Sequence, residues 1–269
     1  MPPLIGEARL TSQTAGPPAH SLLAQSYELA AFLMVHMGKE DLGALAAERA
    51  FTSAVPSNDE LLHAIVQGTY AWVLLHQGRL AQSEKLAVTV ADRMEPSFSA
   101  PSKTIAVWGN LLMTALAPAA AAGHDFSQYV ALASAGAERL RRKVNIYQTS
   151  FGPALVHMQA CHAYAVTRDP ANALAAARRL HPGDLAGISY GRHLLDVAQA
   201  HTDARHSHAE TAVLTQARAL APVWFRHQGI ARSLVTDLCE QQKRLSPTLR
   251  ELATSLDPNW YARYQRPAK

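Results

Sequence analysis

The stretch Phe151–Leu180, with the sequence FGPALVHMQACHAYAVTRDPANALAAARRL, decides the predicted fold. Its first half carries two neighbouring stripes at helical spacing: Leu155, Met158 and His162 in one, and His157, Cys161 and Tyr164 in the other. A helix with two such stripes must be covered on both sides. Asp169 is placed to cap a second helix, and Pro170 stands in its first turn. The stretch therefore predicts a helical hairpin.

One helical hairpin cannot bury its own apolar surface, so the chain is expected to repeat it. Turn segments of similar character recur along the sequence, each followed by a helix rich in Ala and Leu: Met37–Asp41, Gln77–Leu80, Ala122–Asp125, Thr167–Pro170 and Thr202–Arg205. The turn glycines Gly38, Gly78 and Gly123 are 40 and 45 positions apart, which is typical of a degenerate solenoid. No segment has the pattern of a strand. The expected fold is all-α, with about six antiparallel helix pairs.

Three regions are expected along the chain. Residues 1–19 contain four prolines together with Ser, Thr and Gly, which predicts an irregular lead-in. Residues 20–256 are expected to form one helical repeat domain, and residues 257–269 an aromatic tail that contains Trp260 and Tyr264. Within the repeat domain, Pro118 is expected to kink or end its helix, and the helix that starts at Asp125 is expected to run to Lys143.

The composition favours a globular, cytoplasmic protein. Hydrophobic residues make up 48% of the chain and charged residues only 17%, which argues against disorder. No apolar run reaches the roughly 18 to 20 residues that span a bilayer, and the N-terminus lacks the regions of a signal peptide. No membrane association is therefore predicted. Cys161 and Cys239 are expected to be free, buried thiols in a reducing compartment.

The charge of the chain does not predict nucleic-acid binding. The net charge of +4 is small, and the basic residues are spread along the sequence. Glu138–Lys143 is the densest basic run, and it is interpreted as the solvated end of a helix, where cations suit the helix dipole, in preference to a track for phosphates.

Several phrases resemble a known family: Phe151–His157, Leu194–Ala200, Thr211–Pro222 and Ala231–Leu238. They are similar to the C-terminal, tetratricopeptide-like half of actinobacterial Xre-type helix-turn-helix transcriptional regulators, and the resemblance covers residues 20–256. It implies a tetratricopeptide-like solenoid that senses a ligand or mediates oligomerisation, while a separate helix-turn-helix domain binds DNA. Only 19 residues precede the first predicted repeat, so that DNA-binding domain is expected to be missing. The chain would be either a trimmed regulator or a stand-alone descendant.

The expected binding site lies on the concave side of the solenoid, which the first helix of each pair lines. Aromatic and polar residues of these helices would form an apolar pocket suited to a small hydrophobic molecule or a peptide. The candidate ligand-binding residues are Tyr27, Tyr70, Trp72, Trp108, Asn110, Met113, His157 and Cys161.

The sequence contains no recognisable catalytic or metal-binding motif. His157 and Cys161, four positions apart, share a helix face that could hold a soft metal, but no complete ligand set is visible, and neither metal nor cofactor is predicted. His157 is the best candidate general acid or base if the chain is an enzyme; otherwise it orients its helix through a backbone contact. His162 is interpreted as a core histidine with its hydrogen bonds satisfied, and Arg192 and Asp196 are expected to pair on the helix surface.

Three functions stay open from the sequence. The first is a regulator-derived binding protein, with a possible homodimer or regulator partner and without direct nucleic-acid contact. The second is a stand-alone enzyme of specialised metabolism that uses the same pocket with a histidine acid or base. The third is an adaptor that binds only protein.

Overall fold

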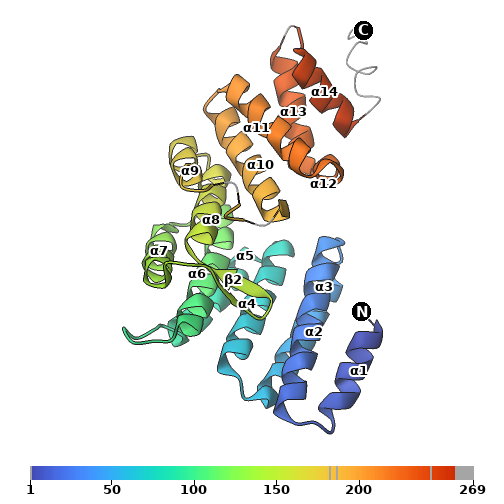
Figure 1. Ribbon diagram of the computed structural model, residues 1–269, viewed down its shortest axis with the longest axis vertical. Coiled ribbons are helices and arrows are strands. Elements are labelled where there is room, and N and C mark those ends of the chain that lie inside the picture. The colour runs from blue at the N-terminus through green and yellow to red at the C-terminus, as the bar shows by residue number, and fades with distance from the viewer. Residues whose placement is uncertain (1, 182, 186, 243, 258–269) are drawn as a thin grey trace. The chain divides into compact units, whose positions relative to one another are not determined.

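The chain consists almost entirely of α-helices. The computed structural model describes residues 2–181, 183–185, 187–242 and 244–257 (Figure 1). Within these ranges the only sheet has two short strands, so the all-α prediction is confirmed. The chain divides into two compact units, residues 1–159 and 160–269, with the division inside α8 (Pro153–Val166).

Unit 1 is a stack of helical hairpins. Its helices are α1 (Pro2–Ser12), α2 (Pro17–His36), α3 (Glu40–Ala54), α4 (Glu60–His76), α5 (Leu80–Arg93), α6 (Ser102–Ala122) and α7 (Ser127–Leu140), with a short 3-10 turn η1 (Val55–Ser57) before α4. Each of the pairs α2–α3, α4–α5 and α6–α7 packs as a hairpin, and α2 contacts α4, which in turn contacts α6. We call α2, α4 and α6 the inner layer of unit 1.

The glycines that mark the predicted repeat end the three helices of the inner layer. Gly38, Gly78 and Gly123 follow α2, α4 and α6, and their φ angles of 67°, 74° and 74° lie in the left-handed region. A glycine adopts this conformation without a steric penalty, and it lets the chain turn into the next helix. The repeated turn predicted from glycine spacing is thus present in the structure.

Prolines mark helix starts in this chain, and one expectation based on them is wrong. Residues 2–12 form α1, and Pro17 opens α2, although residues 1–19 were expected to be irregular. A proline in the first turn loses no backbone hydrogen bond, so it is compatible with a helix there. Pro118 lies inside α6, which continues to Ala122. Its side chain is buried, and that packing offsets the missing backbone hydrogen bond.

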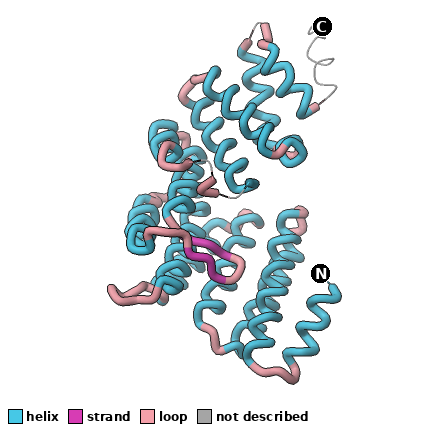
Figure 2. Tube along the Cα trace, viewed as in Figure 1, coloured by secondary structure: helices cyan, strands magenta, loops and turns pink. Residues whose placement is uncertain are grey.

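A β-hairpin follows α7 where the sequence predicted more helix and no strand. α7 ends at Leu140, and β1 (Val144–Ile146) pairs antiparallel with β2 (Thr149–Phe151) (Figure 2). Both strands pack on α6, and a Cβ atom on Gly109 would lie 2.1 Å from Cζ of Phe151. Three-residue strands are too short for an alternating pattern to stand out in the sequence. Their position depends on this fit between Phe151 and Gly109.

α6 is long and apolar enough to cross a membrane, although no such segment is expected from the sequence. The most apolar part of this helix is 72% buried within the fold, as in the core helix of a globular domain. The structure is therefore compatible with a soluble protein.

Unit 2 begins with the helical hairpin that the central stretch predicts. Besides the C-terminal part of α8, it contains α9 (Pro170–Ala177), α10 (Gly187–Asp203), α11 (Ser207–Leu220), α12 (Pro222–Arg226), α13 (Gly229–Gln241) and α14 (Pro247–Leu256). Asp169 caps α9 as predicted, because its Oδ1 accepts a hydrogen bond of 3.1 Å from the backbone N–H of Asn172. Trp260 and Tyr264 of the predicted aromatic tail lie outside the described residues.

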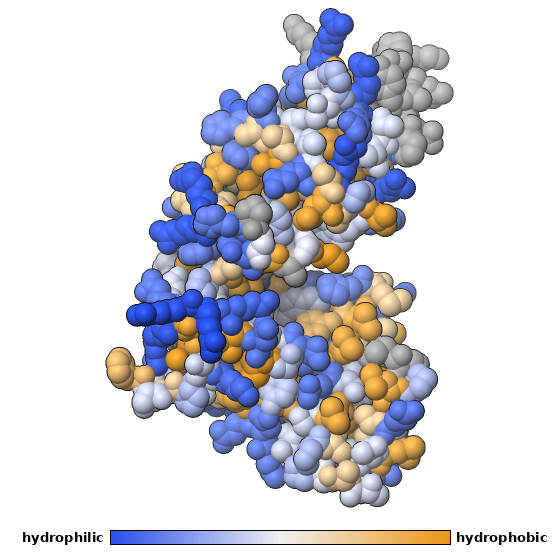
Figure 3. Space-filling view, in the orientation of Figure 1, coloured by the Kyte–Doolittle hydropathy of each residue, from blue (hydrophilic) through white to orange (hydrophobic). Residues whose placement is uncertain are grey.

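Large hydrophobic side chains are exposed on the first three helices of unit 1. Figure 3 shows hydrophobic residues at the surface over α1–α3. The most exposed of them are Leu10, Leu22, Leu42 and Leu4. Such a surface is a candidate for protein contacts, since single domains rarely expose large apolar patches without a reason.

Candidate functional site

Four aromatic rings gather on the inner layer of unit 1, and we call them the aromatic cluster: Phe32, His36, Trp72 and His76. α2 presents Phe32 and His36 one turn apart, and α4 presents Trp72 and His76 in the same way. The Trp72 ring centroid lies 5.1 Å from Phe32, 5.7 Å from His36 and 4.2 Å from His76. Trp72 is half-buried, while both histidines are exposed. Part of the indole therefore stays accessible.

The ring orientation of His76 is fixed by its own helix. Its Nδ1 lies 2.9 Å from the backbone carbonyl oxygen of Trp72. A carbonyl oxygen can only accept a hydrogen bond, so Nδ1 carries a proton and donates it. In the neutral ring, Nε2 is then the nitrogen that can accept a hydrogen bond from a ligand.

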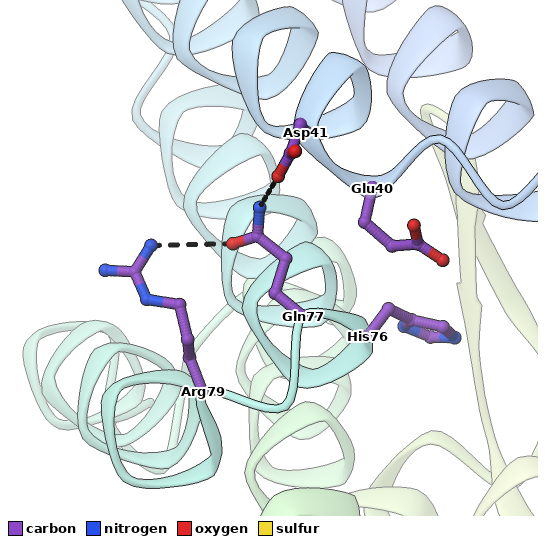
Figure 4. A pocket seen from close by; sticks show the side chains of 5 residues that line it. All are labelled: Glu40, Asp41, His76, Gln77 and Arg79. Carbon is purple, nitrogen blue, oxygen red and sulfur yellow. Dashed lines mark hydrogen bonds between the residues drawn. The ribbon is translucent and has the colours of Figure 1, made fainter.

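His76 also lines a polar depression with a volume of about 680 Å³ next to the aromatic cluster (Figure 4). Its other lining residues are Glu40 and Asp41, from the first turn of α3, and Gln77 and Arg79, from the turn between α4 and α5. Gln77 Nε2 donates a hydrogen bond of 3.2 Å to Asp41 Oδ1, and Arg79 donates one of 3.5 Å to Gln77 Oε1. Figure 4 places Glu40 and His76 on one side of this chain of bonds, away from Arg79.

The aromatic cluster and the polar depression together can hold a ligand with two different ends. A flat or cationic group can lie against Trp72, because an indole face attracts apolar rings and positive charge. Glu40 and the Nε2 atom of His76 can receive a polar or basic end nearby. No proton transfer or nucleophile is needed for this, so the arrangement suits binding.

Tyr27 and Tyr70, also predicted to bind a ligand, face α3. The guanidinium of Arg49 lies 6.0 Å from the Tyr27 ring, and the Tyr70 hydroxyl donates a hydrogen bond of 3.3 Å to Glu48 Oε1. Tyr70 and Trp72 are two positions apart on α4, which puts them on different helix faces. Neither tyrosine belongs to the aromatic cluster.

The predicted residues of α6 are mainly core residues. Trp108 is 7% exposed and Met113 is 3% exposed. The Trp108 ring covers Gly136 of α7, where an added Cβ atom would lie 3.0 Å from Cζ3. The Trp108 side chain therefore packs within the α6–α7 hairpin, and Met113 is buried in the core, whereas Asn110 is half-buried.

His157 and Cys161 lie one turn apart on α8 and differ in burial. His157 is half-buried, whereas Cys161 is fully buried. Burial raises the pKa of the Cys161 thiol to about 12. The thiol is therefore protonated at neutral pH and is neither a good metal ligand nor a nucleophile. Among the residues with described positions, no three His, Cys, Asp or Glu side chains could hold a metal ion together.

A buried acid in the inner layer is absent from the predicted site residues. Glu28 of α2 is fully buried, and its Oε1 accepts a hydrogen bond of 2.7 Å from the Thr69 hydroxyl of α4. Its Oε2 has no hydrogen-bond partner. Burial raises the pKa of Glu28 to about 7, although the bond from Thr69 opposes this. The sequence signal for this buried acid is a glutamate beside the apolar stripe of α2.

Unit 2 contains a carboxylate that orients an imidazole. His162 Nδ1 of α8 lies 3.0 Å from Asp196 Oδ1 of α10, and Asp196 is 4% exposed while the His162 side chain is 25% exposed. The surface pair predicted between Arg192 and Asp196 is wrong, because Asp196 faces the core and pairs with His162. Beside them, burial lowers the pKa of His193, against the opposing effect of Asp196. An Asp–His pair of this kind can serve as a general base.

A second buried acid, Glu210, lies in the first turn of α11. Burial raises its pKa to about 7, the Thr202 hydroxyl opposes that shift, and Asp237 and Asp203 add to it. Asp203 is in turn paired with Arg168. This group of charges extends from Arg168, in the turn after α8, to Asp237 of α13, and it includes no residue that the sequence predicts as a site.

Comparison with known proteins supplies no relative for this chain: no family model, curated protein or solved structure matches it.

Proposed function

We propose that the chain is a regulator-derived, tetratricopeptide-like binding protein of the cytoplasm, which holds a small hydrophobic molecule or a peptide on the inner layer of unit 1. The stacked hairpins support this architecture, because each leaves one helix on a common layer. The resemblance of the four sequence phrases to Xre-type regulators supports the origin. The protein acts through a partner or a second copy, and the exposed hydrophobic residues of α1–α3 are the surface we assign to that contact.

The observation that carries the proposal is the accessible indole of Trp72 beside a polar depression. A half-buried tryptophan flanked by Phe32 and two imidazoles binds a flat apolar or cationic group, while Glu40 and Asp41 favour a basic end. The ligand class that fits both features is a small molecule, or a peptide side chain, with an aromatic or cationic moiety.

Trp72→Ala is expected to abolish ligand binding. Wild-type protein incubated with a fractionated metabolite extract or a peptide mixture should show a higher melting temperature in the active fraction, and mass spectrometry should recover the ligand unchanged. A ligand at about 100 times its Kd stabilises the folded state by about 2.7 kcal/mol. The variant should lose that rise in melting temperature, because the indole is the main contact.

Phe98→Ala is the matched control, since Phe98 is 99% exposed and lies outside the site. It should retain the ligand-dependent rise in full. If Trp72→Ala kept the rise while remaining folded by circular dichroism, the assignment of the site would be wrong.

The second candidate function is acid-base catalysis in unit 2, which the His162–Asp196 pair favours over the His157 candidate. If the chain is an enzyme, His162→Gln is expected to reduce turnover about 100-fold or more, the usual contribution of a general base. Mass spectrometry of a metabolite extract before and after incubation would measure the turnover. His208→Gln, at an exposed position, should leave it unchanged. Equal turnover by the wild type and His162→Gln would exclude this pair as the base.

A further inference from the structure

The β1–β2 hairpin is anchored firmly at its base. Phe151 is 1% exposed and packs directly onto Gly109 of α6, and Ile146 is also buried. Both strands contact α6, and from there the hairpin runs across the inner layer towards α4 (Figures 1 and 2). An isolated two-stranded ribbon is only marginally stable, so its position depends on what it touches.

The tip of the hairpin has a residue that its turn does not favour. Ile146 pairs with Thr149, which leaves Tyr147 and Gln148 as a two-residue loop. Tyr147 has a φ of 50°, in the left-handed region, where such loops favour Gly, Asn or Asp. A tyrosine at this position weakens the turn locally, so its side chain must contribute something that offsets the backbone strain.

The side chain of Tyr147 occupies a defined site between α2, α3 and α4. Its ring, like that of Tyr27, packs against a cluster of small and branched residues: Ala24, Ala50, Ala54, Leu62 and Val66. Its hydroxyl donates a hydrogen bond to Asp59 Oδ2. The other oxygen of Asp59 accepts a bond of 3.0 Å from the backbone N–H of Leu62 and caps α4. The Asp59 carboxylate is thereby held where it can accept a hydrogen bond from a phenol hydroxyl. We call this the phenol site.

Attachment of the hairpin is uneven along its length. At the base a whole phenylalanine ring is enclosed, whereas at the tip one half-buried ring and one hydroxyl make the contact, and Asn145 and Gln148 are exposed. Fewer contacts therefore hold the tip than hold the base. Beneath the tip lies an apolar cluster next to a positioned carboxylate.

We propose that the phenol site is a protein-interaction site for a partner peptide that presents a tyrosine in a tight turn, and that the chain's own hairpin tip is its built-in occupant. The partner segment places its tyrosine ring on the Ala24–Leu62 cluster and its hydroxyl on Asp59, as Tyr147 does. The tip competes with the partner, since a tethered group acts at a high effective concentration. The site lies at the N-terminal end of α4, whereas the aromatic cluster lies near its C-terminal end, so the two can be tested separately.

The experiment measures binding of a ring-closed, fluorescent peptide that copies residues 143–152, KVNIYQTSFG, to the full chain. Tyr147→Asn removes the competing phenol while placing a residue that tolerates the left-handed turn. The peptide is expected to bind this variant at least tenfold more tightly than the wild type. A peptide with phenylalanine in place of its tyrosine should bind the variant at least fivefold more weakly, because it lacks the hydroxyl.

Two further variants make the result specific. Tyr147→Phe keeps the ring and loses only the hydrogen bond to Asp59, so the tyrosine peptide should bind it at least threefold more tightly than the wild type. Tyr147→Phe also tests the proposal if Tyr147→Asn does not fold. Phe98→Ala, which lies outside both sites, should leave peptide binding unchanged. Equal affinity of the peptide for the wild type and both Tyr147 variants, or equal affinity of the two peptides for a variant, would overturn the proposal.

Discussion

Gly109→Ala is expected to destabilise unit 1 by about 3 kcal/mol, because it removes the space that the Phe151 ring fills. The added Cβ atom would lie 2.1 to 2.5 Å from three atoms of that ring, so Phe151 must leave its buried position. Replacing glycine with alanine inside a helix otherwise stabilises it by up to about 1 kcal/mol. Whether Gly109→Ala lowers or raises the free energy of unfolding therefore tests this packing. Thermal and urea unfolding, followed by circular dichroism, measure it.

Gly6→Ala is the control, since Gly6 also lies inside a helix but has nothing within 4 Å of an added Cβ atom. It should be neutral or stabilising. In a Phe151→Ala background the ring is gone, so Gly109→Ala should then cost little, and the double-mutant cycle should show strong coupling. Additive effects of the two substitutions would contradict the direct contact between Phe151 and Gly109.

Glu28→Gln is expected to make the stability of the protein less dependent on pH. The pKa of Glu28 is raised from 4.5 to about 7 in the folded state, so between these values the unfolded chain is ionised while the folded chain keeps its proton. Its contribution to stability is then fully present below about pH 4.5 and falls as the pH rises towards 7. Above pH 7 the loss levels off at about 3 kcal/mol.

A glutamine is always neutral, and its carbonyl can still accept the hydrogen bond from Thr69. The variant should therefore match or fall slightly below the wild type at pH 4.5 and exceed it by about 1 to 3 kcal/mol at pH 8. Glu95→Gln, at an exposed linker position, should change neither value by more than about 0.5 kcal/mol. The explanation fails if Glu28→Gln destabilises the protein equally at both pH values.

The site near Trp72 was only partly predictable. Trp72 was singled out because an aromatic residue on a first helix of a repeat can face a binding layer. Its neighbours Phe32, His36 and His76 follow from the one-turn spacing on α2 and α4, but only the pairing of these helices brings them together. Trp108 and Met113 have the same sequence character and are core residues, and α7 packs on Trp108 through Gly136. Sequence pattern alone does not separate these two outcomes.

The local features of this protein can be predicted from its amino-acid sequence. Helix caps such as Asp169, turn glycines such as Gly38 and Gly78, and the recurrence of hairpins depend on residues within a few positions of one another, so their physical causes are visible in the chain. The contacts between distant segments become apparent only in the folded protein: Tyr147 with Asp59, Glu28 with Thr69, and His162 with Asp196. Each depends on burial and on which helix faces pack together, and these follow from the sum of many weak interactions across the fold.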